Sequence, residues 1–141
     1  MSNESQSRRR FLTLIPGMAA GLVLSRRELF ASTSGEAAVA HPDPRPGIDA
    51  SHMLTRAQVH GSDAKEVFDM VRQIPQIADG IRCHCGCADL PGFYSLLSCY
   101  EKDGMAQHCS VCQGQGRLAF TLFKKGKALD EIRAAIDAKY D

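Results

Sequence analysis

Six cysteines, all the cysteines of this 141-residue chain, lie within a stretch of thirty positions. They are Cys83, Cys85, Cys87, Cys99, Cys109 and Cys112. A small fold gains little from crowded thiols unless they act together, and thiolates are the strongest soft metal ligands that a protein has. The chain must therefore fold so that several distant segments bring these side chains to one place.

Disulfide bonds are one interpretation of this cysteine pattern. Bridged cysteines have Cα atoms ~4.4–6.8 Å apart with their Cβ atoms facing each other, and residues two positions apart reach that geometry only in a strained loop. Three bridges would therefore run from Cys83, Cys85 and Cys87 to Cys99, Cys109 and Cys112. Such close partners already have the geometry of a metal site, but a disulfide-stapled binding scaffold remains an alternative.

Metal binding is the interpretation that we favour. The pair Cys109-x-x-Cys112 has a spacing common in zinc and iron–sulfur sites, and a helix start would lower the pKa of its thiols. The one-residue spacing in Cys83–Cys87 differs from a zinc knuckle and suits thiolates shared by several Cu(I) ions. We therefore predict an exported soft-metal-binding protein that holds Cu(I) or Zn(II) on all six cysteines, for trafficking, storage or detoxification.

Three other side chains near the cysteines are potential donors. His84 and His108 each adjoin a cysteine, and both are candidate secondary ligands of the metal. Met105 is a further soft donor, but methionine more often fills space in a core, and we interpret it as a packing residue.

A thiol–disulfide redox or maturation protein is the alternative from another functional class. Disulfide oxidoreductases also place a Cys-x-x-Cys pair such as Cys109 and Cys112 at a helix start, although their usual βαβ surroundings are missing here. The sequence contains no nucleophile elbow, phosphate-binding loop or His-Glu-x-x-His motif. We therefore expect a binding protein in preference to an enzyme.

The N-terminus has the features of an export signal. Residues 7–12 read S-R-R-R-F-L, which is the form of a twin-arginine motif, and an apolar run over residues 11–24 follows. That run is shorter than the ~20 residues a membrane-spanning helix needs. Small residues at 38–40 resemble a cleavage site. Residues 1–40 are thus predicted to be a signal that directs the protein to the periplasm or the outer face of the cytoplasmic membrane.

Removal of residues 1–40 leaves twelve of the seventeen basic residues and thirteen of the sixteen acidic ones, a net charge of −1. The remaining sequence contains no basic patch, so we do not expect nucleic acid as a partner. We expect membrane contact only through an uncleaved signal segment. The expected partners are a soft metal ion and a protein for metal delivery or redox exchange.

Hydrophobic spacing predicts helices after a proline-rich start. Prolines at alternate positions make 41–61 an extended arm, and 62–141 is predicted to be a helical Cys-rich domain. A capping box at 63–66 should open the first helix, and Pro75 should break it. Helices are expected at 109–125 and 129–140, joined at Gly126. The fold class is mostly α, a small single domain with a Cys-rich loop packed on a C-terminal helical hairpin.

The cysteine run and its surroundings resemble a known family. Residues 83–87 (C-H-C-G-C), 95–101 (S-L-L-S-C-Y-E) and Cys109-x-x-Cys112-Gln113 are similar to the PCYCGC-motif proteins of bacteria, which are exported proteins or lipoproteins named for a motif. The likeness extends to 41–48, 115–119 and 132–137. Arg82 and His84 depart from the Pro and Tyr of the motif. The resemblance implies export and a cysteine-based site, and it supplies no reaction.

Overall fold

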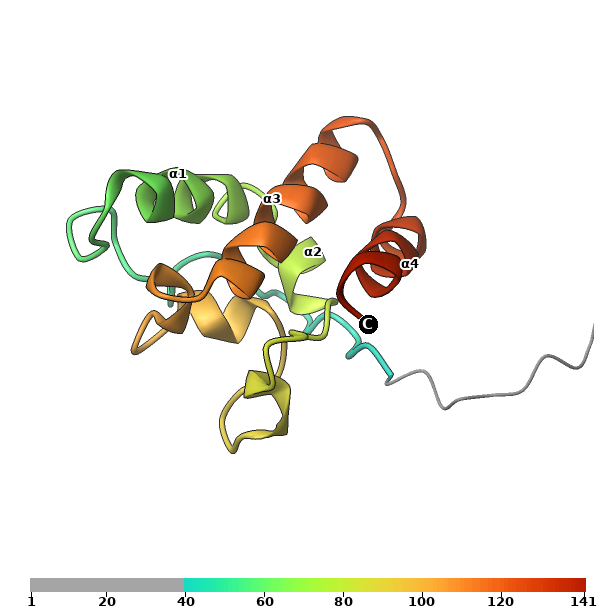
Figure 1. The fold of residues 1–141 in the computed structure, drawn as a ribbon, viewed down its shortest axis with the longest axis horizontal. Coiled ribbons are helices and arrows are strands. Elements are labelled where there is room, and N and C mark those ends of the chain that lie inside the picture. The colour runs from blue at the N-terminus through green and yellow to red at the C-terminus, as the bar shows by residue number, and fades with distance from the viewer. Residues whose placement is uncertain (1–39) are drawn as a thin grey trace, which may run out of the picture. The chain divides into compact units, whose positions relative to one another are not determined.

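Helices and turns make up the part of the chain that the computed structural model describes, residues 40–141 (Figure 1). The elements are α1 (Ser62–Val71), α2 (Pro75–Asp79), α3 (Ser110–Lys124), α4 (Leu129–Tyr140) and the 3₁₀ turns η1 (Cys87–Asp89), η2 (Leu97–Tyr100) and η3 (Met105–Gln107). Among these residues the only pairing of the β type is an isolated bridge between Met53 and Glu101. The predicted mostly α fold is confirmed. The predicted export signal falls outside the described residues, except for Ala40.

The first helix buries an apolar face and begins differently from the sequence prediction. Val67, Phe68 and Val71 are fully buried on one side of α1, as their helical spacing predicts. The expected capping box is wrong: the helix starts at Ser62 after Gly61, with no side-chain hydrogen bond to its first amides. Gly61 has φ 85°, a left-handed conformation that glycine adopts at little cost.

The two C-terminal helices form the predicted hairpin. The left-handed turn at Gly126 ends α3, and the amide of Lys127 donates to the carbonyl of Leu122. The Glu131 carboxylate then accepts a hydrogen bond of 2.9 Å from the amide of Ala128, which stabilises the start of α4. Ile132 and Ile136 on α4 are completely buried. The hairpin therefore presents one apolar side to the rest of the domain.

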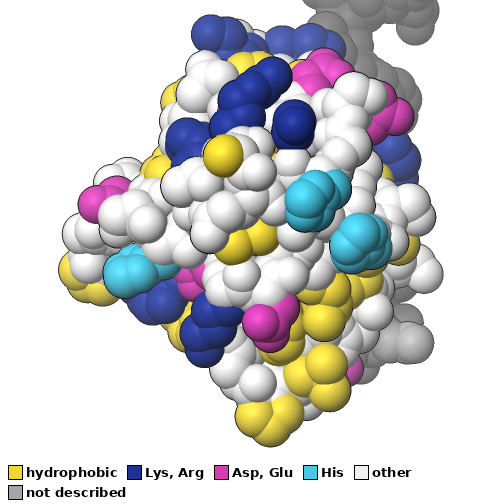
Figure 2. Space-filling model, turned by 90° about the vertical axis from the view of Figure 1, so that its left-hand side faces the viewer, with side chains coloured by type: hydrophobic (Ala, Val, Ile, Leu, Met, Phe, Trp, Pro, Cys, Tyr) yellow, Lys and Arg dark blue, Asp and Glu magenta, His cyan; other side chains and the backbone are white. Residues whose placement is uncertain are grey.

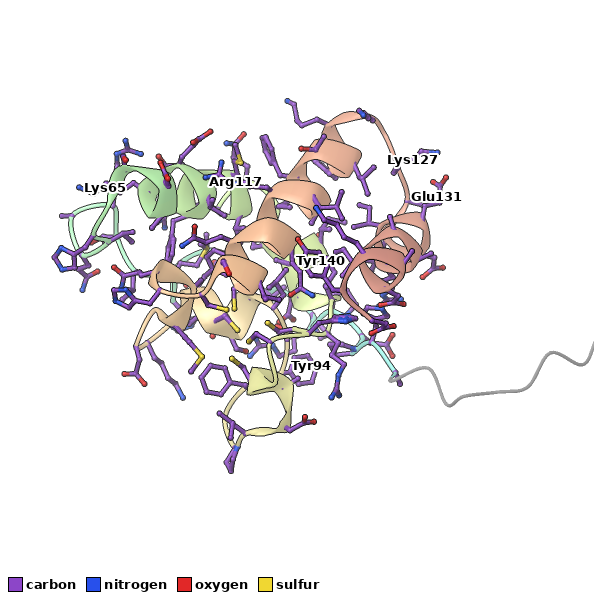
Figure 3. The ribbon with its side chains drawn as sticks, viewed as in Figure 1. Lys65, Tyr94, Arg117, Lys127, Glu131 and Tyr140 are labelled. Atoms are coloured by element: carbon purple, nitrogen blue, oxygen red, sulfur yellow. The ribbon has the colours of Figure 1, made fainter. Side chains whose placement is uncertain are left out.

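Helix α3 occupies the centre of the domain and packs against α1 on one side and α4 on the other (Figure 1). A β-carbon at Gly116 would collide with the Tyr100 hydroxyl and crowd Val67 and Val71. A β-carbon at Gly114 would collide with the hydroxyl of Tyr140, which reaches toward α3 from the end of α4 (Figure 3). Both glycines therefore allow tyrosine side chains to approach the backbone of α3 closely, and Gly116 also allows α1 to do so.

The proline-rich arm is held against the domain by a buried ion pair. Asp79, at the end of α2, is fully buried and accepts hydrogen bonds from the Arg45 amide (2.8 Å), the Arg45 guanidinium (2.8 Å) and the Ser95 hydroxyl (2.7 Å). Burial alone would raise the pKa of Asp79, but the hydrogen bonds from Arg45 and Ser95 outweigh it and lower that pKa. The stabilisation from this carboxylate is therefore present above about pH 4 and is lost in stronger acid.

The surface carries charges of both signs. On the face drawn in Figure 2, basic and acidic side chains lie among histidine and hydrophobic ones. This mixture fits the formal net charge of +1 for the whole chain. Within residues 40–141, none of the helices has the length and apolar character needed to cross a membrane.

Replacing Arg45 with methionine should destabilise the domain by about 3 kcal/mol, because the Asp79 carboxylate would stay buried without its counter-charge. Urea denaturation followed by circular dichroism measures the change. Arg56→Met is the matched control, since Arg56 pairs with Asp69 on the surface and such pairs contribute at most about 1 kcal/mol. Equal losses for the two variants would contradict a structural role for the buried pair.

Candidate metal centre

Five of the six cysteines converge on one point beneath the start of α3. The Sγ atoms of this cysteine cluster all lie within 4.8 Å of one another, and they belong to Cys83, Cys85, Cys87, Cys99 and Cys112. Cys85 is half-buried, and the other four thiols are at most 4% exposed. All six cysteines of the chain are free thiols in this structure. The cluster therefore buries several soft donors without covalent links among them.

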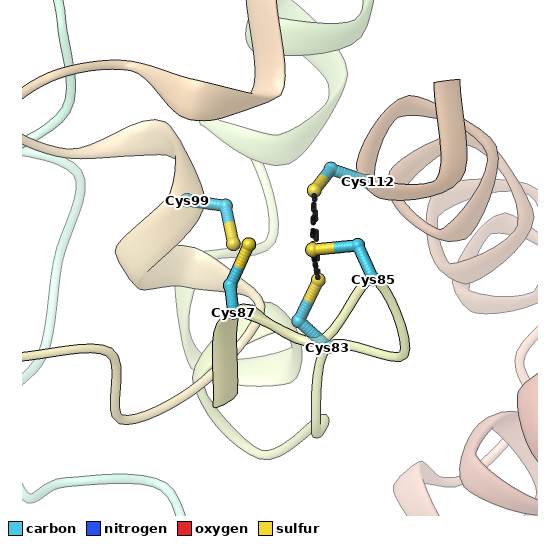
Figure 4. A group of neighbouring side chains, drawn as sticks. All are labelled: Cys83, Cys85, Cys87, Cys99 and Cys112. Atoms are coloured by element: carbon cyan, nitrogen blue, oxygen red, sulfur yellow. Dashed lines mark hydrogen bonds between the residues drawn. The ribbon is translucent and has the colours of Figure 1, made fainter. Parts of the chain in front are cut away.

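Two subgroups make up the cysteine cluster (Figure 4). Cys83 Sγ lies 3.2 Å from Cys85 Sγ and 3.5 Å from Cys112 Sγ, and Cys85 and Cys112 are also 3.5 Å apart. Beside this triad, the sulfur atoms of Cys87 and Cys99 point toward each other. The donors are thus arranged as a compact triad with a pair next to it.

Local chain geometry explains why thiols separated by one intervening residue can face the same point. Gly86 has φ 87° and turns the chain in a left-handed conformation just before η1, so that Cys87 returns toward Cys83 and Cys85. Cys99 comes from η2 and Cys112 from the first turn of α3. The Tyr100 hydroxyl, held by the packing described above, donates a 2.8 Å hydrogen bond to the Cys112 carbonyl and secures that turn.

The sulfur separations suit a shared metal ion. With a metal–sulfur bond of ~2.3 Å, two sulfurs on one ion lie roughly 3.8 Å apart at a tetrahedral angle and roughly 4.6 Å apart at a linear one. The triad at 3.2–3.5 Å is slightly tighter than this, so an ion would spread it by a few tenths of an ångström. The cysteine cluster could therefore hold a metal with little movement of the backbone.

Protonation within the cysteine cluster is uneven. Hydrogen bonding from Cys112, and next from Cys99, overcomes burial and lowers the pKa of Cys83 to about 3. The pKa of Cys112 is raised, chiefly by its contacts with Cys83 and Cys99. Burial, followed by the contact with Cys87, raises the pKa of Cys85. Without metal, Cys83 thus favours the thiolate form, whereas Cys85 and Cys112 favour the protonated form and must release their protons when they bind a metal.

Cys109, the remaining predicted ligand, is not part of the cysteine cluster. It is the N-cap of α3, and its sulfur accepts a 3.4 Å hydrogen bond from the amide of Cys112. The residue before a helix typically has an extended backbone and a side chain that accepts a hydrogen bond from the first turn. Cys109 therefore caps the helix that carries Cys112. His108, beside it, is exposed and also lies outside the cluster.

His84 points away from the cysteine cluster and joins a second polar group. Its side chain is only 8% exposed, and its two ring nitrogens lie 3.2 Å from the Asp137 carboxylate and 3.0 Å from the Asp141 carboxylate. Asp137 also faces His41 Nε2 at 2.9 Å. These contacts, here called the histidine clamp (His41, His84, Asp137 and Asp141), connect the arm, the cysteine loop and the end of α4.

The imidazoles and the Asp137 carboxylate of the histidine clamp are metal-ligand types, but the hydrogen bonds of the clamp favour a structural role. The amide of Arg82 donates to His41 Nδ1 at 3.0 Å, so the proton of a neutral His41 ring sits on Nε2 and points to Asp137. A metal on Nε2 would move that proton to Nδ1, where it would meet the Arg82 N–H. Metal-bound histidines usually donate their other N–H instead. We therefore interpret this group as a hydrogen-bonded clamp.

Several side chains around the cysteine cluster were not predicted from sequence. Met105 Sδ lies 2.8 Å from Cys87 Sγ, although we had interpreted this residue as packing. Gln115 is fully buried one turn after Cys112, and its amide nitrogen has no hydrogen-bond partner among the described residues. Burial and the surrounding cysteines raise the pKa of Tyr100 well above its usual value, which keeps this hydroxyl a donor. In the sequence, Gln115 was marked only by its place in the family-like stretch 115–119 and by its position one helical turn after Cys112.

The arrangement of cysteines agrees with a family comparison. A family model described as a protein of unknown function with PCYCGC motif matches residues 49–141. The chain belongs to this family. No curated protein and no solved structure matches it.

Both departures from the PCYCGC motif involve the histidine clamp: Arg82 contacts it and His84 belongs to it. Arg82 stands at the proline position, and it is the Arg82 amide that donates to His41; a proline would have no N–H to give. His84 stands at the tyrosine position and contacts Asp137 and Asp141. The two substitutions therefore act together on one contact network, separate from the cysteines that the motif shares.

A thiolate should be detectable in the metal-free, reduced protein at about pH 6, more than two units below the pKa of an ordinary thiol. Ultraviolet thiolate absorbance during a pH titration measures it. Cys83→Ser should shift this absorbance to higher pH, whereas Cys109→Ser should leave it unchanged. Because the folded pKa of Cys83 is the lower one, its stabilisation is complete above about pH 9 and declines as the pH falls. A titration with no thiolate below neutral pH would contradict this charge distribution.

Proposed function

We propose that this protein is an exported carrier or store of a soft metal ion, Cu(I) in preference to Zn(II). The observation that carries the proposal is the convergence of five free thiols within 4.8 Å, four of them nearly inaccessible. A buried thiolate, which the lowered pKa of Cys83 favours, costs free energy unless a positive charge compensates it, and a soft metal ion supplies that charge. A soft ion bound there would also contribute to folding.

Donor number and type favour Cu(I) over Zn(II). A structural zinc site takes four ligands in a tetrahedron, which would leave one thiol of the cysteine cluster unused. Cu(I) accepts thiolate and thioether sulfur, and its thiolates can bridge neighbouring ions. The triad with a pair beside it supports such sharing. His84, the nearest nitrogen donor in sequence, faces carboxylates instead.

The sulfur contacts give less support to redox chemistry at Cys109 and Cys112. A redox pair must form one disulfide between its own two sulfurs. Here Cys112 Sγ contacts Cys83 and Cys85, while Cys109 Sγ accepts the hydrogen bond of the helix cap. The thiol–disulfide alternative therefore needs a rearrangement that metal binding does not.

Export follows from the N-terminal sequence in this proposal. The twin-arginine pathway carries folded proteins, so thiols that bind metal in the reducing cytosol would cross the membrane already protected from oxidation. The protein would then act in the periplasm or on the outer face of the cytoplasmic membrane. A metal-delivery protein is the expected partner there.

The metal content of single-serine variants tests the proposal. The full chain, expressed in the cytosol and purified without oxygen, should contain bound Cu(I) and react with thiol reagents only after metal removal. Cys85→Ser should lower the number of ions per chain, because it removes a donor of the triad. Cys109→Ser should retain them, since serine is also a good N-cap. Elemental analysis decides, and metal-free protein with three disulfides would contradict the proposal.

Replacing Arg8 and Arg9 with lysine should retain the protein in the cytosol, because the twin-arginine pair is the recognised part of such signals. Cell fractionation with immunoblotting measures the distribution. Arg26→Lys/Arg27→Lys is the matched control and should not alter export. Unchanged export of the Arg8→Lys/Arg9→Lys variant would show that the twin-arginine pair does not direct export.

A further inference from the structure

Met105 adds a thioether sulfur to the cysteine cluster. Its Sδ atom lies 2.8 Å from Cys87 Sγ, which is closer than any two thiols of the cluster for which a contact is found. Met105 is half-buried, while Cys87 is only 4% exposed. The partly exposed thioether therefore contacts a thiol that is itself nearly inaccessible.

The surroundings of Met105 hold it in this place. It opens η3, directly after Gly104, whose φ of 57° is left-handed and whose missing side chain makes room for Leu54 and Gln107. The Gln113 side-chain amide, on α3, donates to the carbonyls of Ala106 (2.9 Å) and Gln107 (3.1 Å). The turn that carries the thioether is thus attached to the same helix that carries Cys112.

A small cavity leads from the surface to Met105. Its volume is about 100 Å³, and its wall includes Pro91, Phe93, Lys102, Gly104 and Met105. Pro91 and Lys102 are exposed, so the cavity opens to solvent, and Met105, which contacts Cys87, is part of its wall. The space is sufficient for an ion together with a small sulfur ligand, but not for a folded partner.

We infer that Met105 is the capture ligand of the site: it takes Cu(I) from a small thiol carrier in this cavity and passes the ion to Cys87. The inference rests on the proposed soft-metal function and adds the ion's route and the residue that selects it. Thioether sulfur binds Cu(I) well and Zn(II) poorly, so the same contact discriminates between the two metals. The thioether sulfur also carries no proton, so a metal can bind to it without displacing one.

The transfer is a sequence of ligand exchanges in which copper stays Cu(I). One carrier sulfur leaves the ion as the Met105 Sδ–Cu bond forms. Cys87 then gives its proton to the departing carrier thiolate, and the Cys87 Sγ–Cu bond replaces the carrier–copper bond. The ion moves on to the buried thiols of the cysteine cluster, and the carrier leaves as a neutral thiol. No oxidant or reductant takes part.

The test compares Met105→Leu with Met70→Leu in the full chain, reduced and free of metal. Leucine keeps the volume and apolar character of methionine but offers no donor. Met70, which is also half-buried, lies on α1 and serves as the matched control. Cu(I) is supplied as its glutathione complex, and uptake is followed by stopped-flow absorbance of the copper–thiolate bands. Zn(II) affinity is measured in parallel with a chromophoric chelator.

Met105→Leu should slow Cu(I) uptake roughly tenfold or more, a loss in the range seen when a supporting contact of a metal site is removed. Its Zn(II) affinity, and both properties of Met70→Leu, should stay within about twofold of wild type.

The outcomes separate the two proposals. Wild-type uptake rates in Met105→Leu would overturn the capture role while the chain still binds Cu(I). Failure of the wild-type chain to bind Cu(I) at all would overturn the proposed function, and the capture role with it. Equal slowing in Met105→Leu and Met70→Leu would show a packing effect and also refute the inference.

Discussion

The close packing of α3 against α1 and Tyr100 determines where the thiols can meet. Because Gly116 has no side chain, the Tyr100 hydroxyl reaches the backbone of α3 and donates to the Cys112 carbonyl. That hydrogen bond places the first turn of α3 above the loop that carries Cys83 and Cys85. Cys99 precedes Tyr100 in the chain, and η2 therefore brings its thiol to the cysteine cluster as well. Any side chain at Gly116 would push these elements apart and open the cysteine cluster.

Two sets of polar contacts hold the cysteine loop at that place. Asp79, on the segment before the loop, accepts hydrogen bonds from Arg45 in the arm and from Ser95 after the loop. The histidine clamp joins the loop itself to the arm and to α4 through His84 and His41. The Asp79 carboxylate has several hydrogen-bond donors, and His41 and the Nδ1 atom of His84 face carboxylates, although His84 Nε2 makes no hydrogen bond among the described residues. The loop is therefore preorganised, and its thiols need to move little to bind an ion.

Much of the fold followed from the sequence, because helical periodicity and breakers are local signals. The apolar stripe of α4, the break at Pro75 and the turn at Gly126 all predicted elements that the structure contains. The start of α1 was missed, since Asp63 and Glu66 match a capping box by residue type alone. Because every cysteine lies in one stretch, the sequence predicted that all six would converge, and five of them do.

The partners of individual site residues could not be predicted in this way, since they depend on contacts between distant segments. Cys109 and Cys112 look equivalent in sequence, yet one caps α3 and the other enters the cysteine cluster. His84 adjoins two cysteines but turns toward Asp137, more than fifty residues away. Met105 resembles a packing residue until Gly104 and Gln113 fix the turn that aims it at Cys87.

Metal-edge X-ray absorption of the chain, purified without oxygen and loaded with Cu(I), tests the central claim most directly. A spectrum that requires only sulfur neighbours at ~2.3 Å, with no nitrogen or oxygen shell, is the predicted result. Histidine nitrogen or carboxylate oxygen as principal ligands would place the metal at the histidine clamp. Such a spectrum would contradict the assignment of the cysteine cluster as the metal centre.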